Sequence, residues 1–324
     1  MTGKEKEDYA IRSAEVGAHG SAATLPPVIA AIKSDLIDGV RRGNYADLAF
    51  IGNSSNAYPW TPCLMVDIDV FLFANELNEQ LGSWLLDRAA SWRAQVARQR
   101  IDFELRVIEG PYKPAVTLLE RPIIVLHLGV FTELRYLASP PLKRWAWRKY
   151  SCVTEPNRLE RLAPPRPDLT ELLYGPKGVE YRLNAIASGS VTMNELVLPS
   201  FREVTFSISL DEPNFAECCF AYSLSSSRNH GRILGFREAD SLPNETYFQW
   251  YNQNVLSCPG LLRILQIKMQ CRDTGFDVNN AMVQTLAVQY LKSLSTTLEM
   301  SIQAQTRSQT TNSVQGDTGP VIAA

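Results

Sequence analysis

Hydrophobic positions along the chain recur with two periods, and each period predicts a different kind of element. Between residues 28 and 40 the apolar side chains fall three or four positions apart, which predicts a helix that ends at Gly43 and Asn44. Residues 76–99 repeat this spacing, with glutamates near the start and arginines near the end, which suits a helix dipole. The stretch "RIDFELRVI" (100–108) alternates apolar and polar residues instead, so we expect a strand there.

Apolar runs predict three more strands in the first half of the chain. They are "ADLAFIG" (46–52), "CLMVDIDVFLF" (63–73) and "RPIIVLHLGVF" (121–131). Residues 139–168 are rich in Pro, Arg, Lys and Trp and indicate a long connection. Helical spacing returns in 169–189, in 280–302 and in 244–270, where Pro259 and Gly260 divide the pattern into two helices.

These patterns predict an α+β protein with a small mixed sheet flanked by helices, followed by a mainly helical domain. The expected organisation is a flexible N-terminus (1–25), an α/β domain (26–165), a mainly helical domain (166–305) and a polar, disordered tail (306–324).

Composition and charge narrow the classes of function. The net charge of −2 and the pI near 6.0 argue against a bulk electrostatic grip on nucleic acid, although a local basic groove stays open. No apolar run is long enough to span a membrane, and the charged first 20 residues do not read as a secretory signal. Six scattered cysteines indicate reduced thiols in a cytoplasmic protein, and three isolated histidines do not predict a zinc site.

The strand at 63–73 carries the chain's most informative polar residues, Asp67 and Asp69. Side chains alternate along a strand, so both carboxylates lie on one face, about 6.6 Å apart along the strand axis. Two carboxylates this close repel each other, and a divalent cation such as Mg²⁺ would relieve that repulsion. The alternative is a solvated face on which the aspartates keep an edge strand soluble.

Two neighbouring segments favour the metal hypothesis. The turn Gly52-Asn53-Ser54-Ser55 follows one apolar strand and precedes the next, and its N–H and hydroxyl donors suit a phosphate; an ordinary strand exit uses the same residues. The strand at 100–108 follows a single helix and offers a further carboxylate, either Asp102 or Glu104.

This order of strand, Gly/Ser turn, Asp-x-Asp strand, helix and acidic strand resembles the nucleotidyltransferase superfamily, which includes beta-type DNA polymerases, poly(A) polymerases and antibiotic nucleotidyltransferases. The resemblance lies in "FIGNSS" and "VDIDV" and covers about residues 35–110. The chain departs from the family pattern at Asn53, where the family has Gly or Ser, and in the long gap between the turn and Asp67.

The resemblance implies a Mg²⁺- or Mn²⁺-dependent enzyme that moves a nucleoside monophosphate from an NTP such as ATP to a hydroxyl acceptor by a two-metal mechanism. Asp67 and Asp69 would hold both ions, with Asp102, or Glu104 in its place, as the third carboxylate. Gly52 with Ser54 or Ser55 would contact the phosphates. The low positive charge favours a small-molecule acceptor over RNA. Two alternatives are the same fold acting on RNA or protein, and a degenerate fold that only binds.

Three other features have a structural and a functional interpretation. The basic stretch 139–166, with Lys149 among its cations, could hold phosphates and stack a base, but its tryptophans also suit packing on the core. The Ser-rich segment 223–236 with Arg228 could hold a triphosphate or be a plain loop. His127 lies in a strongly apolar strand, and we interpret it as a structural residue.

Overall fold

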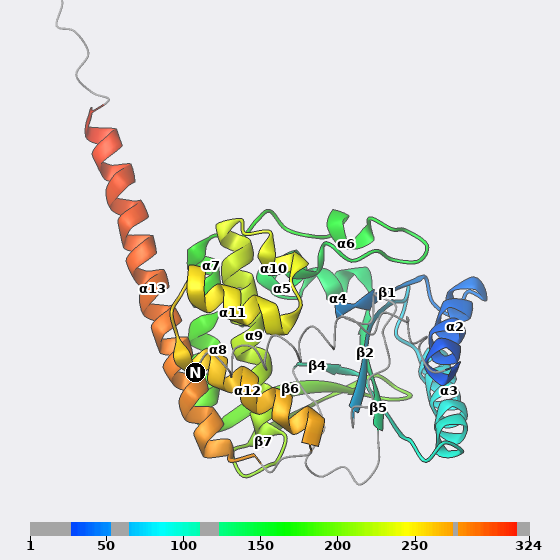
Figure 1. Ribbon diagram of the computed structural model, residues 1–324. Helices are drawn as coiled ribbons and strands as arrows, with labels where there is room; N and C mark the ends of the chain where they lie inside the picture. Colours follow the sequence, from blue (N-terminus) through cyan, green and yellow to red (C-terminus); the bar gives the residue numbers. More distant parts are fainter. Residues whose placement is uncertain (1–26, 53–64, 111–122, 275–277, 316–324) are drawn as a thin grey trace, which may run out of the picture.

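The computed structural model describes residues 27–52, 65–110, 123–274 and 278–315 and has an α+β architecture (Figure 1). The strands are β1 (Asp47–Ile51), β2 (Met65–Phe73), β3 (Asp102–Arg106), β4 (Ile108–Glu109), β5 (Ile123–Phe131), β6 (Ser190–Val197) and β7 (Arg202–Ser209). The helices are α2 (Pro27–Arg41), α3 (Glu79–Ala97), α4 (Glu133–Leu137), α5 (Pro141–Trp147), α6 (Arg158–Arg161), α7 (Leu169–Tyr174), α8 (Val179–Ala187), α9 (Phe215–Leu234), α10 (Glu238–Ser241), α11 (Asn244–Asn254), α12 (Pro259–Thr274) and α13 (Asn280–Gln315).

A four-stranded mixed sheet forms the centre of the first half, with the strand order β1-β2-β5-β3. β1 pairs antiparallel with β2, whereas β5 is parallel to both β2 and β3. The four strand predictions are confirmed over the residues that the structure describes. The order in the sheet differs from the order in the chain, because β5 lies between β2 and β3.

One face of this sheet packs against α2 and α3, to the right of the sheet in Figure 1. Alternate residues of β2 and β5, among them Ile68 and Leu126, meet the apolar side of α3, where Trp92 is fully buried. The Trp92 indole N–H donates to Asp35 of α2 at 2.8 Å, which satisfies the one polar atom of that ring. The opposite face of the sheet is therefore the one turned toward the rest of the molecule.

A second sheet with the order β4-β6-β7 was not predicted from the sequence. In β6 buried and exposed residues alternate, so Val191 and Met193 lie in the core of the helical half. Further along, Leu196 belongs to the core of the first half. Gly82 of α3 lies against Pro199, since an added Cβ would come within 2.0 Å of its carbonyl oxygen. This hairpin therefore joins the two halves.

The second half is mainly helical, as predicted, and α9 is its central buried helix. The Ser-rich segment 223–236 is not a loop: it is the second half of α9 and ends at Gly235, whose φ is +88°. A helix tolerates these serines because the hydroxyls of Ser225 and Ser227 donate back to Ala221 O and Leu224 O at 2.7 and 2.9 Å.

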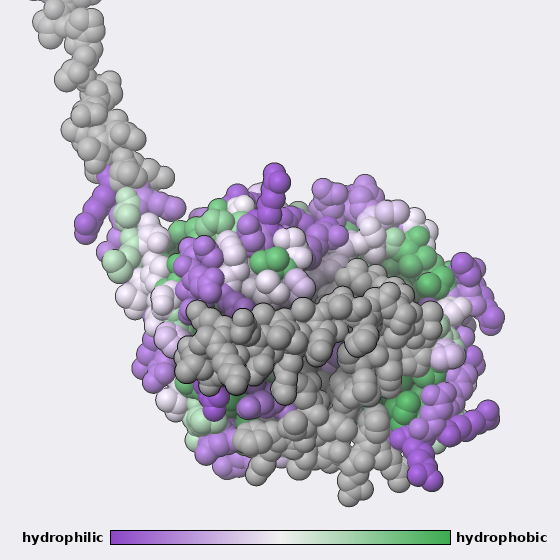
Figure 2. Space-filling model, viewed as in Figure 1, coloured by the Kyte–Doolittle hydropathy of each residue, from purple (hydrophilic) through white to green (hydrophobic). Residues whose placement is uncertain are grey.

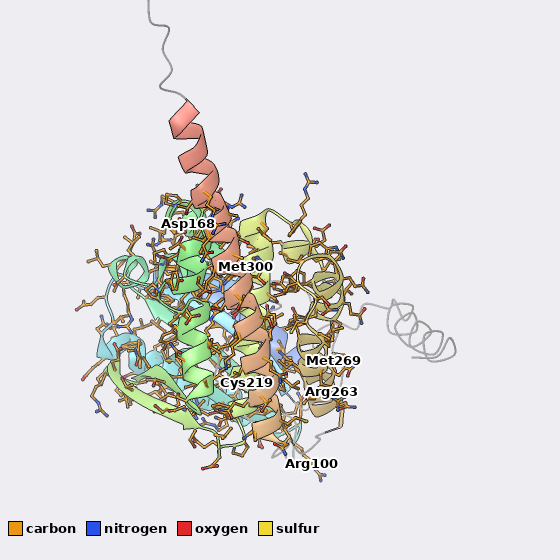
Figure 3. All side chains as sticks on the ribbon, turned by 90° about the vertical axis from the view of Figure 1, so that its left-hand side faces the viewer. Arg100, Asp168, Cys219, Arg263, Met269 and Met300 are labelled. Carbon is orange, nitrogen blue, oxygen red and sulfur yellow. The ribbon has the colours of Figure 1, made fainter. Side chains whose placement is uncertain are left out.

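The last helix, α13, runs along the outside of the helical half, with Met300 on its surface (Figure 3). It continues to Gln315, past residue 305, where the sequence pattern indicated the start of a disordered tail. Its buried residues, including Leu291 and Leu298, lie in the part that packs on the body. The helix beyond this part is held by its own backbone hydrogen bonds, which a polar sequence without Gly or Pro allows as far as residue 315.

The predicted connection at 139–168 contains the short helices α5 and α6. Trp145 of α5 is 3% exposed and packs in the core of the helical half, which confirms the structural interpretation of that tryptophan. On the face shown in Figure 2, apolar residues form separate small patches among hydrophilic ones, as on ordinary domain surfaces. Within the described part of the chain, no helix combines the length and apolar character that crossing a membrane requires.

Candidate functional site

Asp67, Asp69 and His127 come together on the sheet face that α2 and α3 leave uncovered. Each offers one ligand atom, and the three atoms lie within 4.8 Å of one another. β2 contributes both aspartates by its two-residue period, and the parallel register of β2 and β5 sets His127 directly beside Asp69. Among the described residues, Asp67, Asp69 and His127 therefore form a group that could hold a metal ion.

The histidine ring holds the two carboxylates together. His127 Nδ1 lies 2.8 Å from Asp67 Oδ1 and 3.4 Å from Asp69 Oδ1. Burial disfavours the imidazolium, but Asp67 and then Asp69 outweigh burial and raise the pKa of His127 to about 9. The side chains of His127 and Asp67 are 10% and 16% exposed, against 42% for Asp69, so solvent reaches the group from the Asp69 side.

The sheet order explains why a histidine, and not Asp102 or Glu104, lies beside the aspartates. Both carboxylates are on β3, which β5 separates from β2. Asp102 is exposed and pairs in register with Ile123, and Glu104 forms an ion pair with Arg106. The structure therefore brings Asp67 and Asp69 together and places Asp102 and Glu104 apart from them.

Sequence reasoning interpreted His127 as a structural residue and so missed it. The signal was present in "IIVLHLGVF", because a strand that is apolar on both faces belongs in the middle of a parallel sheet. A middle strand was bound to be a neighbour of the Asp-x-Asp strand or of the acidic strand. Its one titratable side chain was therefore a candidate for contact with them.

Gly52 lies at the edge of the same group. Its φ of +61° turns the chain out of β1, and a Cβ added there would lie 3.8 Å from Asp69 Oδ2. The Gly52 N–H donates to the hydroxyl of Tyr150, whose pKa burial raises. Asp69 and Asp240 both act electrostatically on this hydroxyl, as does Arg232, so Tyr150 lies between the aspartate group and a cluster of cations.

That cluster, which we call the basic cluster, consists of Lys149, Arg232 and Arg228 around Asp240. Lys149 Nζ and Arg232 Nε both contact Asp240 Oδ1, at 2.7 and 2.8 Å. Arg228 donates to Ala239 O, Leu242 O and Asn244 Oδ1 and lies over the Tyr247 ring at 4.4 Å. The structure thus brings the predicted residues Lys149 and Arg228 into one cluster and adds Arg232. The Arg228 guanidinium, however, already donates hydrogen bonds to oxygen atoms of the protein itself.

Aromatic side chains bound the aspartate group on the side of the carboxyl ends of β2 and β5. Phe71 follows Asp69 on the same face, and its ring centre lies 4.3 Å from that of Trp147 of α5. Gly129, opposite Phe71, leaves room for these rings, since a Cβ there would come within 2.9 Å of Phe71 and 2.7 Å of Phe131. These rings form an aromatic wall along one side of the group.

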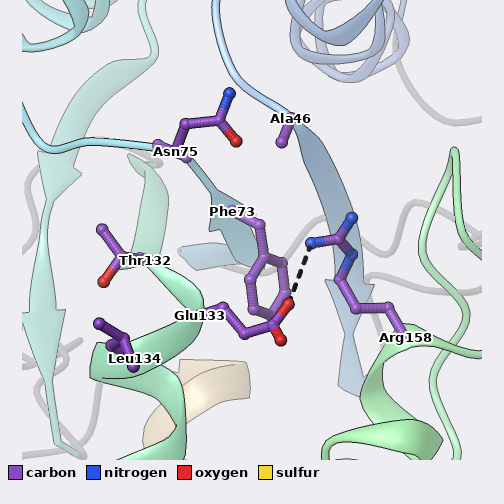
Figure 4. Close-up of a pocket in the computed structure, with 8 residues that line it drawn as sticks. Ala46, Phe73, Asn75, Thr132, Glu133, Leu134 and Arg158 are labelled. Carbon is purple, nitrogen blue, oxygen red and sulfur yellow. Dashed lines mark ion pairs between the residues drawn. The ribbon is translucent and has the colours of Figure 1, made fainter.

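A shallow pocket of about 250 Å³ lies beyond this wall, where β2 and β5 end (Figure 4). Glu133 and Arg158 line it and form an ion pair at 4.0 Å. Arg158 also contacts Asp47 at 3.3 Å and Glu155 at 3.0 Å. The charged side chains at this pocket are thus paired with one another, and none of the residues that line it belongs to the Asp67–Asp69–His127 group.

The residues present fit a divalent cation. Two carboxylates and an imidazole are accepted metal ligands, and one ligand atom of each lies within 4.8 Å of the others. Ser54 and Ser55, the predicted phosphate ligands, lie outside the described residues. Comparison of the chain with protein-family models, with curated proteins and with solved structures found no match in any of the three. The hypothesis of a nucleotidyltransferase therefore depends on the residues themselves.

Proposed function

We propose that the protein is a divalent-cation-dependent nucleotidyltransferase that moves a nucleoside monophosphate from an NTP to the hydroxyl group of a small acceptor. The observation that carries the proposal is the three-ligand group of Asp67, Asp69 and His127 on a sheet face, beside the glycine turn that follows β1. It brings Asp67 and Asp69, from one of the two motifs in which the sequence resembles this superfamily, close to Gly52 from the other.

The chain's own residues would act in two places. Asp67 and Asp69 would hold the cation, and the aromatic wall of Phe71 and Trp147 would keep bulk water from one side of it. A bound cation lowers the pKa of an acceptor hydroxyl and offsets charge on the leaving pyrophosphate. With such a cation in place, the remaining work of the protein is positioning and charge stabilisation.

The basic cluster is the proposed site for the phosphates. Lys149 and Arg232 share one carboxylate, Asp240, so the three groups keep a net positive charge. Tyr150 connects this cluster with Gly52 and Asp69 through its hydroxyl. A polyphosphate that reaches from this cluster toward Asp69 would contact Lys149 and Arg232 at one end. At the other end it would contact the proposed divalent ion, so positive charge would offset the phosphates at both ends.

A turnover assay tests this proposal. Each of the four NTPs is incubated with the protein, Mg²⁺ or Mn²⁺, and a set of small hydroxyl compounds, and pyrophosphate release is measured. We expect release with at least one NTP, and a loss of about 100-fold or more in Asp67→Asn. Asp87→Asn, on the exposed side of α3, is the matched control and should keep the activity. No release in any combination, or equal release in Asp67→Asn, contradicts the proposal.

A binding module without catalysis is the second candidate, and His127 favours it. Where the superfamily pattern has a third carboxylate, this chain places an imidazole that the two aspartates keep protonated. Such a group neutralises part of the site without a metal. Equilibrium binding of the same NTPs distinguishes the two candidates: nucleotide binding without pyrophosphate release supports the module, and release supports the enzyme.

A further inference from the structure

The superfamily resemblance does not say which cation a site with a histidine ligand would prefer. We propose that Asp67, Asp69 and His127 form a centre for one first-row transition-metal ion, in preference to Mg²⁺. The inference deepens the proposed function, since it names the cation of the same site. Its test needs no nucleotide turnover.

The donor atoms are the first argument. Mg²⁺ takes oxygen ligands and keeps several waters, whereas imidazole nitrogen is a ligand for transition metals. Of the three donors here, one is a ring nitrogen, and it is the most buried of the three side chains, with 10% exposure. A cation that reaches both aspartates meets this nitrogen as well.

The spacing is the second argument. Neighbouring ligands of an octahedral ion at about 2.1 Å lie roughly 3 Å from each other. His127 Nδ1 is 2.8 and 3.4 Å from the nearest oxygens of Asp67 and Asp69. The three donors therefore converge to the separation that one shared ion requires. A hydrogen bond between His127 and Asp67 has the same length, so the measurement must detect the nitrogen at the metal directly.

The fixed position of the ring is the third argument. His127 lies in a strand that has a parallel neighbour on each side, in register with Asp69, and its side chain is only 10% exposed. The nearest replacement carboxylate on the neighbouring strand is Glu104, which Arg106 holds, and Arg106 in turn contacts Glu195 at 3.1 Å. A centre in which Glu104 replaced His127 as the third protein ligand would have to break these ion pairs.

Pulsed electron paramagnetic resonance of Mn²⁺ bound to the full chain gives the direct test. It is carried out without nucleotide and again with inorganic tripolyphosphate, because phosphate oxygens commonly complete such sites. We expect a coupling to ¹⁴N in the wild type under at least one of these conditions, and none in His127→Gln. The absence of bound Mn²⁺, or bound Mn²⁺ without this coupling under both conditions, overturns the inference.

Competition binding tests the preference. For the wild type we expect affinities in the order Co²⁺, Mn²⁺, Mg²⁺, following the general order for divalent ions at nitrogen-containing sites. His127→Asp restores three carboxylates and should reduce the ratio of Mn²⁺ to Mg²⁺ affinity by about tenfold or more. His230→Gln, at the other buried histidine, is the matched control and should keep the ratio. Circular dichroism verifies that each variant is folded.

An unchanged ratio in a folded His127→Asp overturns the inference. If that variant does not fold, the ¹⁴N coupling of the wild type decides alone. The outcome is also independent of catalysis. A ¹⁴N-coupled ion without pyrophosphate release contradicts only the proposed function, and release with Mg²⁺ from a protein that shows no such coupling contradicts only this inference.

Discussion

Two carboxylate sites on the same face of the four-stranded sheet differ in how their charge is balanced. Asp47, at the start of β1, is fully buried and accepts hydrogen bonds from the backbone N–H groups of Leu48, Thr154 and Glu155 at 2.8 to 3.0 Å. Arg158 Nε adds an ion pair at 3.3 Å. Asp67 and Asp69 share one histidine between them.

The difference separates a structural carboxylate from a candidate ligand. Burial alone would have indicated Asp47 as the functional carboxylate, because it has 0% exposure and lies beside a pocket. Its neighbours, however, supply three backbone N–H donors and an arginine that Asp47 shares with two glutamates, so this carboxylate is satisfied within the protein. At Asp67 and Asp69, two carboxylates lie close together beside one imidazole, and the Asp69 side chain is 42% exposed, so a ligand can reach this group from solvent.

Replacing Asp47 should give the largest loss of stability among these changes. Asp47→Asn keeps the shape but removes the one fully buried carboxylate that Arg158 contacts, and it turns an amide NH₂ group toward backbone donors. We expect the free energy of unfolding to fall by about 3–5 kcal/mol, measured by urea denaturation. Asp69→Asn, without added metal, should change it by no more than about 1 kcal/mol. Equal losses in both variants would remove the distinction between the two sites.

The sequence predicted the features that depend on local information and missed those that depend on long-range contacts. The periodicities in β1, β2, α3 and β5 are local, and they predicted these elements correctly. The alternation of β3 also correctly put Phe103 into the core and Asp102 outside it. The Asp-x-Asp pair needed only the period of a single strand. Each of these features depends on residues close together in the chain.

The third member of the candidate site, His127, could not be predicted this way, because its position depends on which strands are neighbours. β3 follows β2 in the chain, but a parallel crossover puts β5 between them, and His127 takes the position beside Asp69. The hairpin of β6 and β7 was missed for a related reason. Its strand β7 is largely exposed, so its sequence carries little of the apolar pattern that marks a buried strand.

His230 is a second buried histidine and, unlike His127, it has no carboxylate among the causes of its pKa shift. His230 in α9 contacts the hydroxyl of Tyr251 at 2.7 Å, and burial lowers its pKa from 6.5 to about 4. The unfolded chain therefore binds a proton between these two values that the folded protein does not. The contribution of His230 to stability is greatest above pH 6.5 and falls by about 3 kcal/mol as the pH drops to 4.

Urea denaturation at pH 7, 5.5 and 4 measures this loss. His230→Gln should be less stable than the wild type at pH 7, because it loses the fit to Tyr251, but its stability should fall less steeply toward pH 4. The difference between the two curves isolates the contribution of His230 from that of the carboxylates. Parallel curves for both proteins would mean that folding does not lower the pKa of His230.

Added Mn²⁺ should stabilise one carboxylate site and leave the other unaffected. A ligand at 100 times its Kd raises the free energy of unfolding by about 2.7 kcal/mol when only the folded state binds it. We expect this increase in the wild type and in Asp87→Asn, measured by thermal denaturation against Mn²⁺ concentration. Asp69→Asn should lose most of it. An Asp69→Asn variant that Mn²⁺ stabilises as much as the wild type would show that the ion binds elsewhere.

The smallest predicted effect concerns the glycine beside Asp69, and a second glycine provides its control. Gly52 has a φ of +61° and Gly43 a φ of +73°, and a Cβ at Gly43 would meet no atom within 4 Å. Alanine at either position costs about 1 kcal/mol, because a side chain disfavours this backbone conformation. Since the Gly52 Cβ would lie 3.8 Å from Asp69 Oδ2, only Gly52→Ala should also weaken the binding of Mn²⁺. Calorimetric titration of both variants checks this, and an equal affinity in the two would place the bound ion away from the Gly52 turn.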